Sequence, residues 1–405
     1  MNWKDKNVLI TGIGGFVGPH LSKALLEKGA NIYGLIRRHN TNKIPVNLEK
    51  HRIEDYVNLV MGDLTDIPSL ANAIDYSQPD YIFHLAAQSF VPYSFEDPQS
   101  TTIINSIGTQ NLLESMRIKD CDARMIFAGS SEEYGLIISS KQQYEKLLEK
   151  YGHITPDIID NKYDELPISE NNPLRPMNPY AVSKLCADFI TRNYHHSFGL
   201  DTIVSRAFNH EGAGRGDMFV TSVITKQVNQ LKKGLIDSIK IGNVNAFRDW
   251  THINDMINGY INLAENGVSG EAYNQASMRT NSIISYILLS LEEAGYTINS
   301  VTTLNNDKRV DEPTLINDDK YFGVKFDKTK VDSLLLENQL EYSIKDKGLL
   351  VNSDCGVIKI EFNPERFRPS DVPILLADNT KIRKIGMTIN YGIRDIIKDQ
   401  LEYFN

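Results

Sequence analysis

A tyrosine and a lysine four residues apart, Tyr180 and Lys184 in NPYAVSK, are the pair best suited to proton transfer in this sequence. On a helix this spacing puts both side chains on one face. Asn178 can cap that helix, and Pro179 suits its first turn. A nearby ammonium and the positive end of a helix both stabilise a phenolate and lower a tyrosine pKa from about 10. We therefore predict that Tyr180 removes a proton from a hydroxyl while hydride leaves the same carbon.

A second group of reactive side chains lies in GSSEEYG, after an apolar run. Ser130 or Ser131 could hydrogen-bond the reacting oxygen and hold it against Tyr180. Glu132 could remove a carbon-bound proton beside a ketone, which simple hydride transfer does not require. The alternative interpretation of Glu132 is a surface carboxylate on a loop.

A glycine-rich turn, TGIGGFVG, separates the first apolar run from the first helical pattern. Gly12 permits a tight turn, Gly15 lets backbone N–H groups approach a pyrophosphate, and Gly18 lets helix and strand pack closely. A glycine motif alone is weak evidence, and it could be an unoccupied joint. Its place at the first strand of an alternating strand–helix pattern favours a dinucleotide site.

The end of the second predicted strand bears on the choice of cofactor. A ribose hydroxyl usually meets Asp or Glu there, whereas a 2′-phosphate meets Arg. This sequence has Arg37 and Arg38, and two guanidinium groups can chelate a phosphate. NADP is therefore favoured over NAD. Asp63, after the third strand, could meet the adenine edge, or Asp63 or Thr65 could cap the next helix.

Short apolar runs that alternate with helical patterns must position these groups. The predicted strands are NVLITG, NIYGLI, VNLVMGDL, YIFHLAAQS, ARMIFAGSS and TIVSRAFN, with a helix from Pro19 to Gly29. Such alternation implies parallel crossovers, hence an α/β doubly wound parallel sheet with its crevice at the carboxyl ends of the strands.

The pattern changes after Asn209 and predicts a discontinuous organisation. Residues 1–208 and about 248–277 form the expected Rossmann-type domain, and residues 209–247 and about 278–405 a smaller α+β C-terminal substrate lobe. Within the latter we expect a helix over Phe219 to Lys233. Residues 137–166 and 317–362 are expected to be insertions.

Composition restricts the class of protein. A net charge of -9 disfavours a nucleic-acid partner. No apolar run is long enough for a bilayer, and the start lacks a signal-peptide layout, so we expect a cytoplasmic enzyme without a membrane partner. The three cysteines fit no metal spacing and are expected to be buried free thiols. No metal site is expected.

Together these motifs resemble the extended short-chain dehydrogenase/reductase superfamily. Its marks are TGIGGFVG, GDL, HLAAQS, NSIGT, SSEEYG and YAVSK. FNHEGAGRG, FVT, RDW and RFRPSDV resemble the GDP-mannose 4,6-dehydratase group, whereas ITKQV and the proline in RPSDVP are more similar to the GDP-4-keto-6-deoxymannose reductases. Glu132 does not discriminate between the two groups.

The resemblance implies contacts for each ligand. Ser130, Ser131, Glu132, Tyr180 and Lys184 would be catalytic. For the cofactor it implies, with Tyr180 and Lys184, contacts from Gly12, Gly15, Phe16, Val17, Gly18, Arg37, Arg38, Asp63, Leu64, Leu85, Ala86 and Ala87. For the substrate it implies contacts from Ser89, Asn209, Arg215, Val220, Arg248, Arg368 and Asp371.

The resemblance also implies a reaction. Tyr180 would deprotonate a C4 hydroxyl, Glu132 would take the C5 proton and help expel the C6 hydroxyl, and NADP would be recycled. The substrate would be a nucleotide sugar, with GDP-mannose favoured, and the enzyme a homodimer or homotetramer. The alternatives are an NADPH-dependent reductase of the 4-keto sugar, a UDP- or CDP-sugar dehydratase or epimerase, and a non-catalytic sensor.

Overall fold

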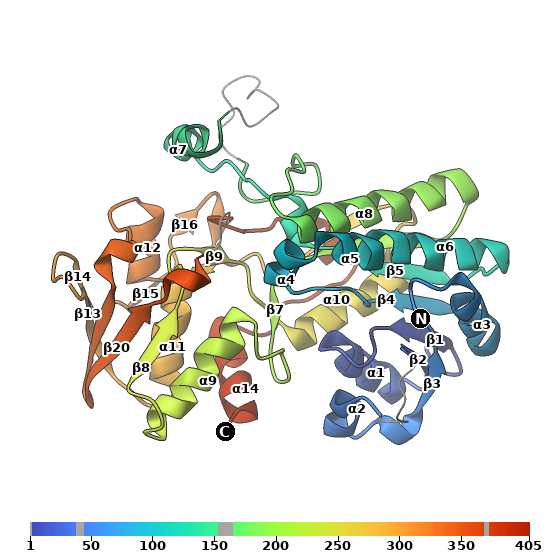
Figure 1. The fold of residues 1–405 in the computed structure, drawn as a ribbon, viewed down its shortest axis with the longest axis horizontal. Helices are drawn as coiled ribbons and strands as arrows, with labels where there is room; N and C mark the ends of the chain where they lie inside the picture. Colours follow the sequence, from blue (N-terminus) through green and yellow to red (C-terminus); the bar gives the residue numbers. More distant parts are fainter. Residues whose placement is uncertain (1, 38–43, 153–164, 368–371) are drawn as a thin grey trace.

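The computed structural model describes residues 2–37, 44–152, 165–367 and 372–405, and it has two units that face each other (Figure 1). One is a parallel sheet with helices on both faces. The other is a smaller lobe of mixed strands and helices, drawn in yellow to red. The predicted fold class is therefore confirmed.

The seven-stranded sheet has the order β11-β6-β5-β4-β1-β2-β3, and all its pairs are parallel. Its strands are β1 (Asn7–Thr11), β2 (Asn31–Ile36), β3 (Val57–Met61), β4 (Tyr81–His84), β5 (Arg124–Ala128), β6 (Thr202–Ala207) and β11 (Ala272–Gln275). The chain builds outward from β1 in one direction, then restarts at β4 on the other side. The switch between β1 and β4 therefore opens a crevice at their carboxyl ends.

Side chains that alternate along each strand serve two separate cores. Val8 and Ile10 of β1 pack with helices on one face, and Leu9 packs on the other. The first face is covered by α1 (Val17–Glu27) and α10 (Ile253–Asn266). The second face is covered by α3 (Ile67–Ser77), α6 (Gly108–Ile118) and α8 (Pro179–Phe198). Burial on both faces explains why these strands are continuous apolar runs.

Shorter elements connect these helices. They are α2 (Val46–His51), η1 (Glu54–Tyr56), α4 (Val91–Glu96), α5 (Pro98–Thr102), the π-helical segment η2 (Ile103–Ile107), η3 (Ser131–Glu133) and α7 (Lys141–Tyr151). Helix α7 stands away from the rest of the domain (Figure 1). It lies in the predicted insertion 137–166, part of which is outside the described residues.

The lobe is built on a five-stranded sheet of order β14-β13-β19-β20-β8. Its strands are β8 (Ser238–Ile241), β13 (Ile298–Thr303), β14 (Arg309–Asp311), β19 (Gly348–Ser353) and β20 (Gly356–Phe362). Side chains of α9 (Val220–Lys232), α11 (Ile283–Glu293) and α14 (Ile393–Tyr403) share one apolar core with this sheet. The lobe therefore has its own core, independent of the parallel sheet.

Residues 317–362, which we expected to be an insertion, contribute to the centre of the lobe. Strands β19 and β20 come from this segment and pair with each other inside the five-stranded sheet. Ile358 and Ile360 point into the core, while Lys359 between them is exposed. Charged residues on the outer face of the sheet interrupt the apolar pattern, so these strands were not predicted from the sequence.

The remaining elements surround the lobe and its junction with the domain. They are β7 (His210–Glu211), β9 (Phe247–Arg248), β10 (Thr251–His252), β12 (Asn281–Ser282), β15 (Ile316–Asn317), β16 (Lys320–Tyr321), β17 (Val324–Lys325), β18 (Lys328–Thr329), α12 (Lys330–Leu336), η5 (Ile344–Asp346), η6 (Pro364–Arg366) and α13 (Thr380–Lys384). None of the described helices has the length and apolar character needed to cross a membrane.

The prediction of buried cysteines was wrong for two of the three thiols. All three are free, but Cys186 and Cys355 are exposed and only Cys121 is partly buried. Cys186 lies on the outer face of α8, and Cys355 lies in the turn between β19 and β20. Their burial depends on tertiary position rather than on residue type.

Helix α1 lies so close to the turn after β1 at Gly18 that we expect Gly18→Ala to weaken the fold. A Cβ atom there would lie 2.6 Å from the Ile13 Cα and carbonyl oxygen, which are backbone atoms that cannot move aside cheaply. Overpacking of this kind costs about 1–3 kcal/mol. Urea unfolding should show a loss of this size. Gly392→Ala is the control, because its nearest atom would lie 3.6 Å away. Equal stability of the two variants would contradict the prediction.

Candidate active site

The glycine-rich turn lies directly beside the end of β4. Gly12 has φ +74°, and a Cβ atom there would lie 2.7 Å from the Ala86 nitrogen. The Thr11 hydroxyl hydrogen-bonds His84 Nδ1 at 2.7 Å and accepts the Ala86 N–H at 3.1 Å. The turn and residues 85–87 therefore form one narrow cradle of backbone. Only glycine fits this conformation and this distance without strain.

Arg37 and Asp63 lie on the same side of this cradle, after β2 and β3. The Asp63 carboxylate accepts the N–H and the hydroxyl of Thr65 at 2.9 and 2.8 Å. The Thr65 N–H and the charge of Arg37 lower the pKa of Asp63. Helix α3 begins later, at Ile67, so neither Asp63 nor Thr65 is its cap residue. Arg38 lies outside the described residues.

A short turn after β5 carries the first reactive side chains. Ser130 precedes η3, and its hydroxyl accepts the N–H of Glu132 at 3.2 Å. The Glu133 carboxylate accepts the N–H of Ser130 at 2.7 Å, which closes a capping box. Ser131 and Glu133 are buried, whereas Glu132 is partly exposed. The turn therefore leaves one carboxylate accessible and holds the next one inside.

The N-terminus of α8 faces this turn. Asn178 caps α8, as predicted: its Oδ1 accepts the N–H of Ala181 at 2.8 Å. Its Nδ2 donates to Glu132 Oε2 at 3.0 Å. Tyr180 hydrogen-bonds the Ser130 side chain. The structure therefore brings Ser130, Glu132 and Tyr180 together.

Lys184 follows Tyr180 by one turn of α8, and its ammonium contacts the end of β5. Nζ donates to the Ala128 carbonyl at 2.8 Å and lies 4.9 Å from the Phe127 ring centroid. Burial lowers the pKa of Lys184 to about 8, opposed by the charge of Glu133. The lysine is held under the reactive turn by the backbone of β5.

The expected direction of the Tyr180 pKa was wrong for this structure. Burial raises the pKa of Tyr180 to about 12, and the carboxylates of Glu132 and Glu133 act in the same direction. The hydrogen bond from Ser130 and the charge of Arg215 lower it, but by less. Desolvation of the phenolate thus outweighs the nearby cation and hydrogen bond.

Arg215 reaches the site from the lobe side of the crevice. Its guanidinium carbon lies 5.3 Å from the Phe16 ring centroid and 3.5 Å from that of Phe219, and Nε is 3.4 Å from Glu211 Oε2. Phe219 also meets Phe90 edge to face at 6.1 Å. Arg215 therefore links the glycine turn to the start of α9, where Val220 lies.

Aromatic residues that were not predicted from the sequence also line this crevice. Phe90 directly follows Ser89, and Phe219 directly precedes Val220, so each adjoins a predicted contact residue. His210 also belongs here, because its ring lies parallel to that of Phe16 at 6.1 Å. Large aromatic side chains next to predicted ligand contacts were the available signal.

Two residues predicted to contact the substrate have well-defined surroundings. Asn209 follows β6, and its buried Oδ1 has no hydrogen-bond partner among the described residues. Arg248 lies in β9 and donates to the carbonyls of Phe247 and Val372 at 2.8 and 2.7 Å. Arg368 and Asp371 lie outside the described residues. The roles of all four in binding stay predictions.

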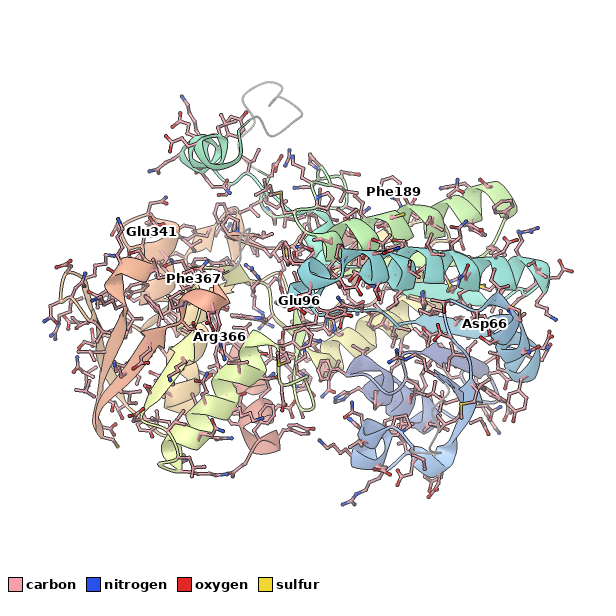
Figure 2. The ribbon with its side chains drawn as sticks, in the orientation of Figure 1. Asp66, Glu96, Phe189, Glu341, Arg366 and Phe367 are labelled. Atoms are coloured by element: carbon pink, nitrogen blue, oxygen red, sulfur yellow. The ribbon has the colours of Figure 1, made fainter. Side chains whose placement is uncertain are left out.

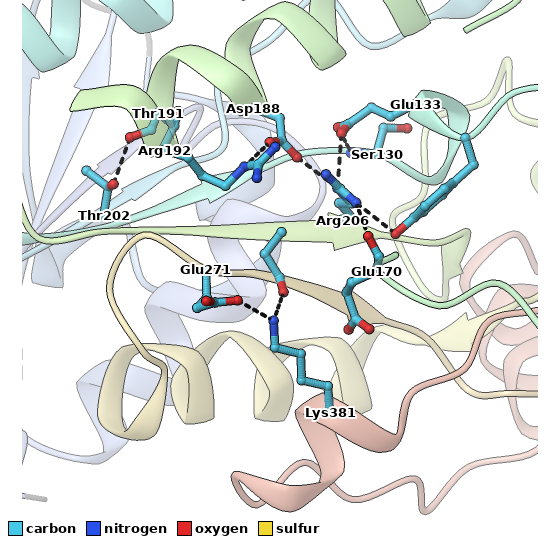
Figure 3. Close-up of polar contacts among 12 residues, drawn as sticks. Ser130, Glu133, Glu170, Asp188, Thr191, Arg192, Thr202, Arg206, Glu271 and Lys381 are labelled. Carbon is cyan, nitrogen blue, oxygen red and sulfur yellow. Dashed lines mark hydrogen bonds and ion pairs between the residues drawn. The ribbon is translucent and has the colours of Figure 1, made fainter. Parts of the chain in front are cut away.

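Behind the reactive turn, Arg206 of β6 is shared by two buried carboxylates (Figure 3). Arg206 Nε donates to Asp188 Oδ2 at 2.8 Å and lies 3.5 Å from Glu133 Oε2. Arg192 Nε donates to Asp188 Oδ1 at 2.6 Å. Burial and the charge of Asp188 raise the pKa of Glu133, against the charge of Arg206. These four residues, termed the Arg206 cluster, join β6, α8 and η3.

Two family profiles match most of the chain between them. The profile described as NAD dependent epimerase/dehydratase family matches residues 8–276. The profile described as GDP-mannose 4,6 dehydratase matches residues 161–400. Both matched ranges contain Tyr180, Lys184 and Arg206.

Relatives agree with these profiles. The GDP-mannose 4,6-dehydratase of Yersinia enterocolitica is 31% identical, over 98% of this chain and 93% of its own length. The GDP-mannose 4,6-dehydratase of Vibrio cholerae serotype O1 is 30% identical, over 98% of this chain and 94% of its own length. The structure of RMD from Pseudomonas aeruginosa complexed with NADPH has a TM-score of 0.64 at 22% identity, covering 98% of this chain and 99% of that one. At that identity the likeness shows the fold alone.

We expect Asp188→Asn to lower the free energy of unfolding by up to about 3–5 kcal/mol, because Glu133 alone then faces the buried charge of Arg206. Asp188 has no exposed side-chain surface and accepts from both Arg206 and Arg192. Denaturant unfolding measures the loss. Asp311→Asn, which weakens an exposed pair with Arg309, is the matched control and should change stability little. An unchanged unfolding midpoint for Asp188→Asn would contradict the importance of the cluster.

Proposed function

Since the chain belongs to the NAD-dependent epimerase/dehydratase family, and within it to the GDP-mannose 4,6-dehydratases, we propose that it is a lyase that removes water from GDP-mannose. The product would be GDP-4-keto-6-deoxymannose. The observation that carries the proposal is the carboxylate of Glu132, which lies in the same turn as Ser130 and is bonded to the cap of the helix that carries Tyr180. Glu132 supplies the second base that dehydration needs, and the dehydratase profile and relatives favour dehydration over reduction of the 4-keto sugar.

The described residues fit NADP as the resident cofactor. A side chain at Gly12 would fill the cradle beside Ala86, so the cradle is shaped for backbone approach to a diphosphate. Arg37, after β2, supplies positive charge that would face the 2′-phosphate of the adenosine, and Asp63 would meet the adenine edge. When bound, NADP would accept a hydride from C4 of the sugar and return it to C6, so none would be consumed.

Each protein group has a distinct task in this reaction. Tyr180 would accept the C4 hydroxyl proton, with Ser130 holding the oxygen. Because burial keeps the pKa of Tyr180 high, positive charge must offset it, and Arg215 already acts in that direction. Glu132 would take the C5 proton next to the new ketone and deliver a proton to the C6 hydroxyl as it leaves as water.

We also propose that copies of the chain associate, as a homodimer or homotetramer, through the outer face of α8 and η2. Val182 and Phe189 of α8 are 51% and 53% exposed, and Ile103 and Ile107 of η2 are 39% and 44% exposed. Figure 2 shows Phe189 on the outer side of α8. Clustered apolar surface of this kind marks an association site. The free cysteines suit a reducing compartment, which supports a cytoplasmic location.

The purified protein should release water from GDP-mannose without added NADPH. Mass spectrometry of a panel of nucleoside-diphosphate hexoses would identify the substrate and the loss of water. A dehydratase turns over without net consumption of cofactor, whereas a reductase of the 4-keto sugar uses one NADPH for each product. Water loss only from a UDP- or CDP-hexose, or strict consumption of NADPH, would contradict the proposal.

Two variants serve as step-specific controls for this assay. Tyr180→Phe should abolish nearly all turnover yet still bind NADP, because it lacks only the phenol that accepts the first proton. Glu132→Gln should still oxidise C4, read as reduced nicotinamide, but should not exchange the C5 hydrogen with deuterated water. Full activity of Glu132→Gln would exclude the dehydratase mechanism.

Phe189→Glu should dissociate the assembly, because a carboxylate cannot be buried in an apolar interface without a partner. Light scattering should give a multiple of the 45.8 kDa chain mass for the unmodified protein and a smaller multiple for the variant. Leu235→Glu is the control, since Leu235 is 70% exposed but lies after α9 in the lobe. A monomeric unmodified protein, or an unchanged mass for Phe189→Glu, would refute the interface.

A further inference from the structure

Asn178 contacts both halves of the candidate site through one amide group. Its Oδ1 accepts the Ala181 N–H at 2.8 Å and so caps α8. Its Nδ2 donates to Glu132 Oε2 at 3.0 Å. The residue is 8% exposed, so water competes little for either contact. The helix that carries Tyr180 and the turn that carries Glu132 are thus joined at this residue.

The cap determines which way the amide faces. Only the amide oxygen can accept the Ala181 N–H, so the NH₂ group must lie on the other side, toward Glu132. A flipped amide would lose the cap and would set its oxygen against a carboxylate oxygen. Both contacts therefore support the same orientation, and the donor that faces Glu132 is fixed by the start of α8.

This donor makes the two carboxylate oxygens of Glu132 inequivalent, because it bonds only Oε2. An amide NH₂ donates and cannot accept, so it favours an unprotonated Oε2. No hydrogen bond joins Oε1 of Glu132 to any residue in the described part of the chain. Proton uptake and release at Glu132 are therefore directed to Oε1, while Oε2 stays bonded to Asn178.

We propose that Asn178 is a positioning residue for the elimination half of the reaction. It holds Glu132 so that one carboxylate oxygen removes the C5 proton and the same oxygen delivers a proton to the departing C6 hydroxyl. The C–H electron pair at C5 forms the C5–C6 double bond as the C6–O bond breaks, which leaves water. This role rests on the proposed function, but it assigns Asn178 no part in the oxidation of C4 by Tyr180.

Asn178→Asp tests the role most sharply, because it keeps the shape and the cap oxygen but replaces the donor with a second acceptor. Asn178→Ser also keeps a cap residue and lacks the reach to Glu132. In both variants we expect the rate of C5 exchange in deuterated water to fall about tenfold to a hundredfold, the range for a hydrogen bond to a charged group. In Asn178→Ser, which adds no charge near Tyr180, formation of reduced nicotinamide in a single turnover should change by less than about threefold, because Ser130, Tyr180 and the cap remain.

Asn363→Asp is the matched control, since Asn363 caps η6 in the lobe and its Oδ1 accepts the N–H of Glu365. It should leave both rates unchanged. Exchange at C5 as fast in Asn178→Asp as in the unmodified enzyme would overturn the positioning role. Equal losses in C4 oxidation and C5 exchange would also overturn it, because they would indicate a purely structural cap. Failure of the unmodified enzyme to release water from GDP-mannose would instead reject the proposed function, and the positioning role with it.

Discussion

Arg206 carries its charge in the interior of the domain, with a side chain only 3% exposed, and its neighbours are arranged to balance it. Asp188 and Glu133 both lie against it, and Arg192 joins on the far side of Asp188. A charge removed from water is tolerated only when its partners are complete and correctly placed. Because those partners come from α8 and η3, the condition fixes the two elements relative to β6. The candidate site lies where the same two elements meet.

The same burial sets the acid–base character of the site. The pKa of Tyr180 is raised to about 12 and that of Lys184 is lowered to about 8, each mainly by desolvation. Both shifts favour the neutral form of the side chain. At neutral pH the Tyr180 phenol therefore stays protonated, whereas Lys184, with a pKa of about 8, still carries most of its charge. Charge brought by ligands in the crevice can act strongly because little water screens it.

Local patterns predicted the sheet, its crevice, the Asn178 cap and the pairing of Tyr180 with the turn at Ser130, because strand periodicity and capping chemistry act over a few residues. They could not predict that Glu133 would be buried and Glu132 partly exposed. The two residues are identical and adjacent, and only the tertiary position of Arg206 distinguishes them. The predicted direction of the Tyr180 pKa shift was wrong for the same reason, because desolvation is a property of the packed fold. The lobe strands in 317–362 were missed because solvent-facing charges interrupt them.

The order of strands has a consequence for how the protein is made. Strand β6 lies next to the edge of the parallel sheet and pairs with β11, yet the start of the lobe, including α9 and β8, lies between them in the chain. During synthesis, the edge of β6 that pairs with β11 therefore stays unpaired until the ribosome has added the intervening lobe residues and β11 itself. Unpaired strand edges are where nascent chains pair wrongly with one another. The interleaved topology thus makes the two units dependent on each other during synthesis, and neither can be expected to mature as a separate fragment.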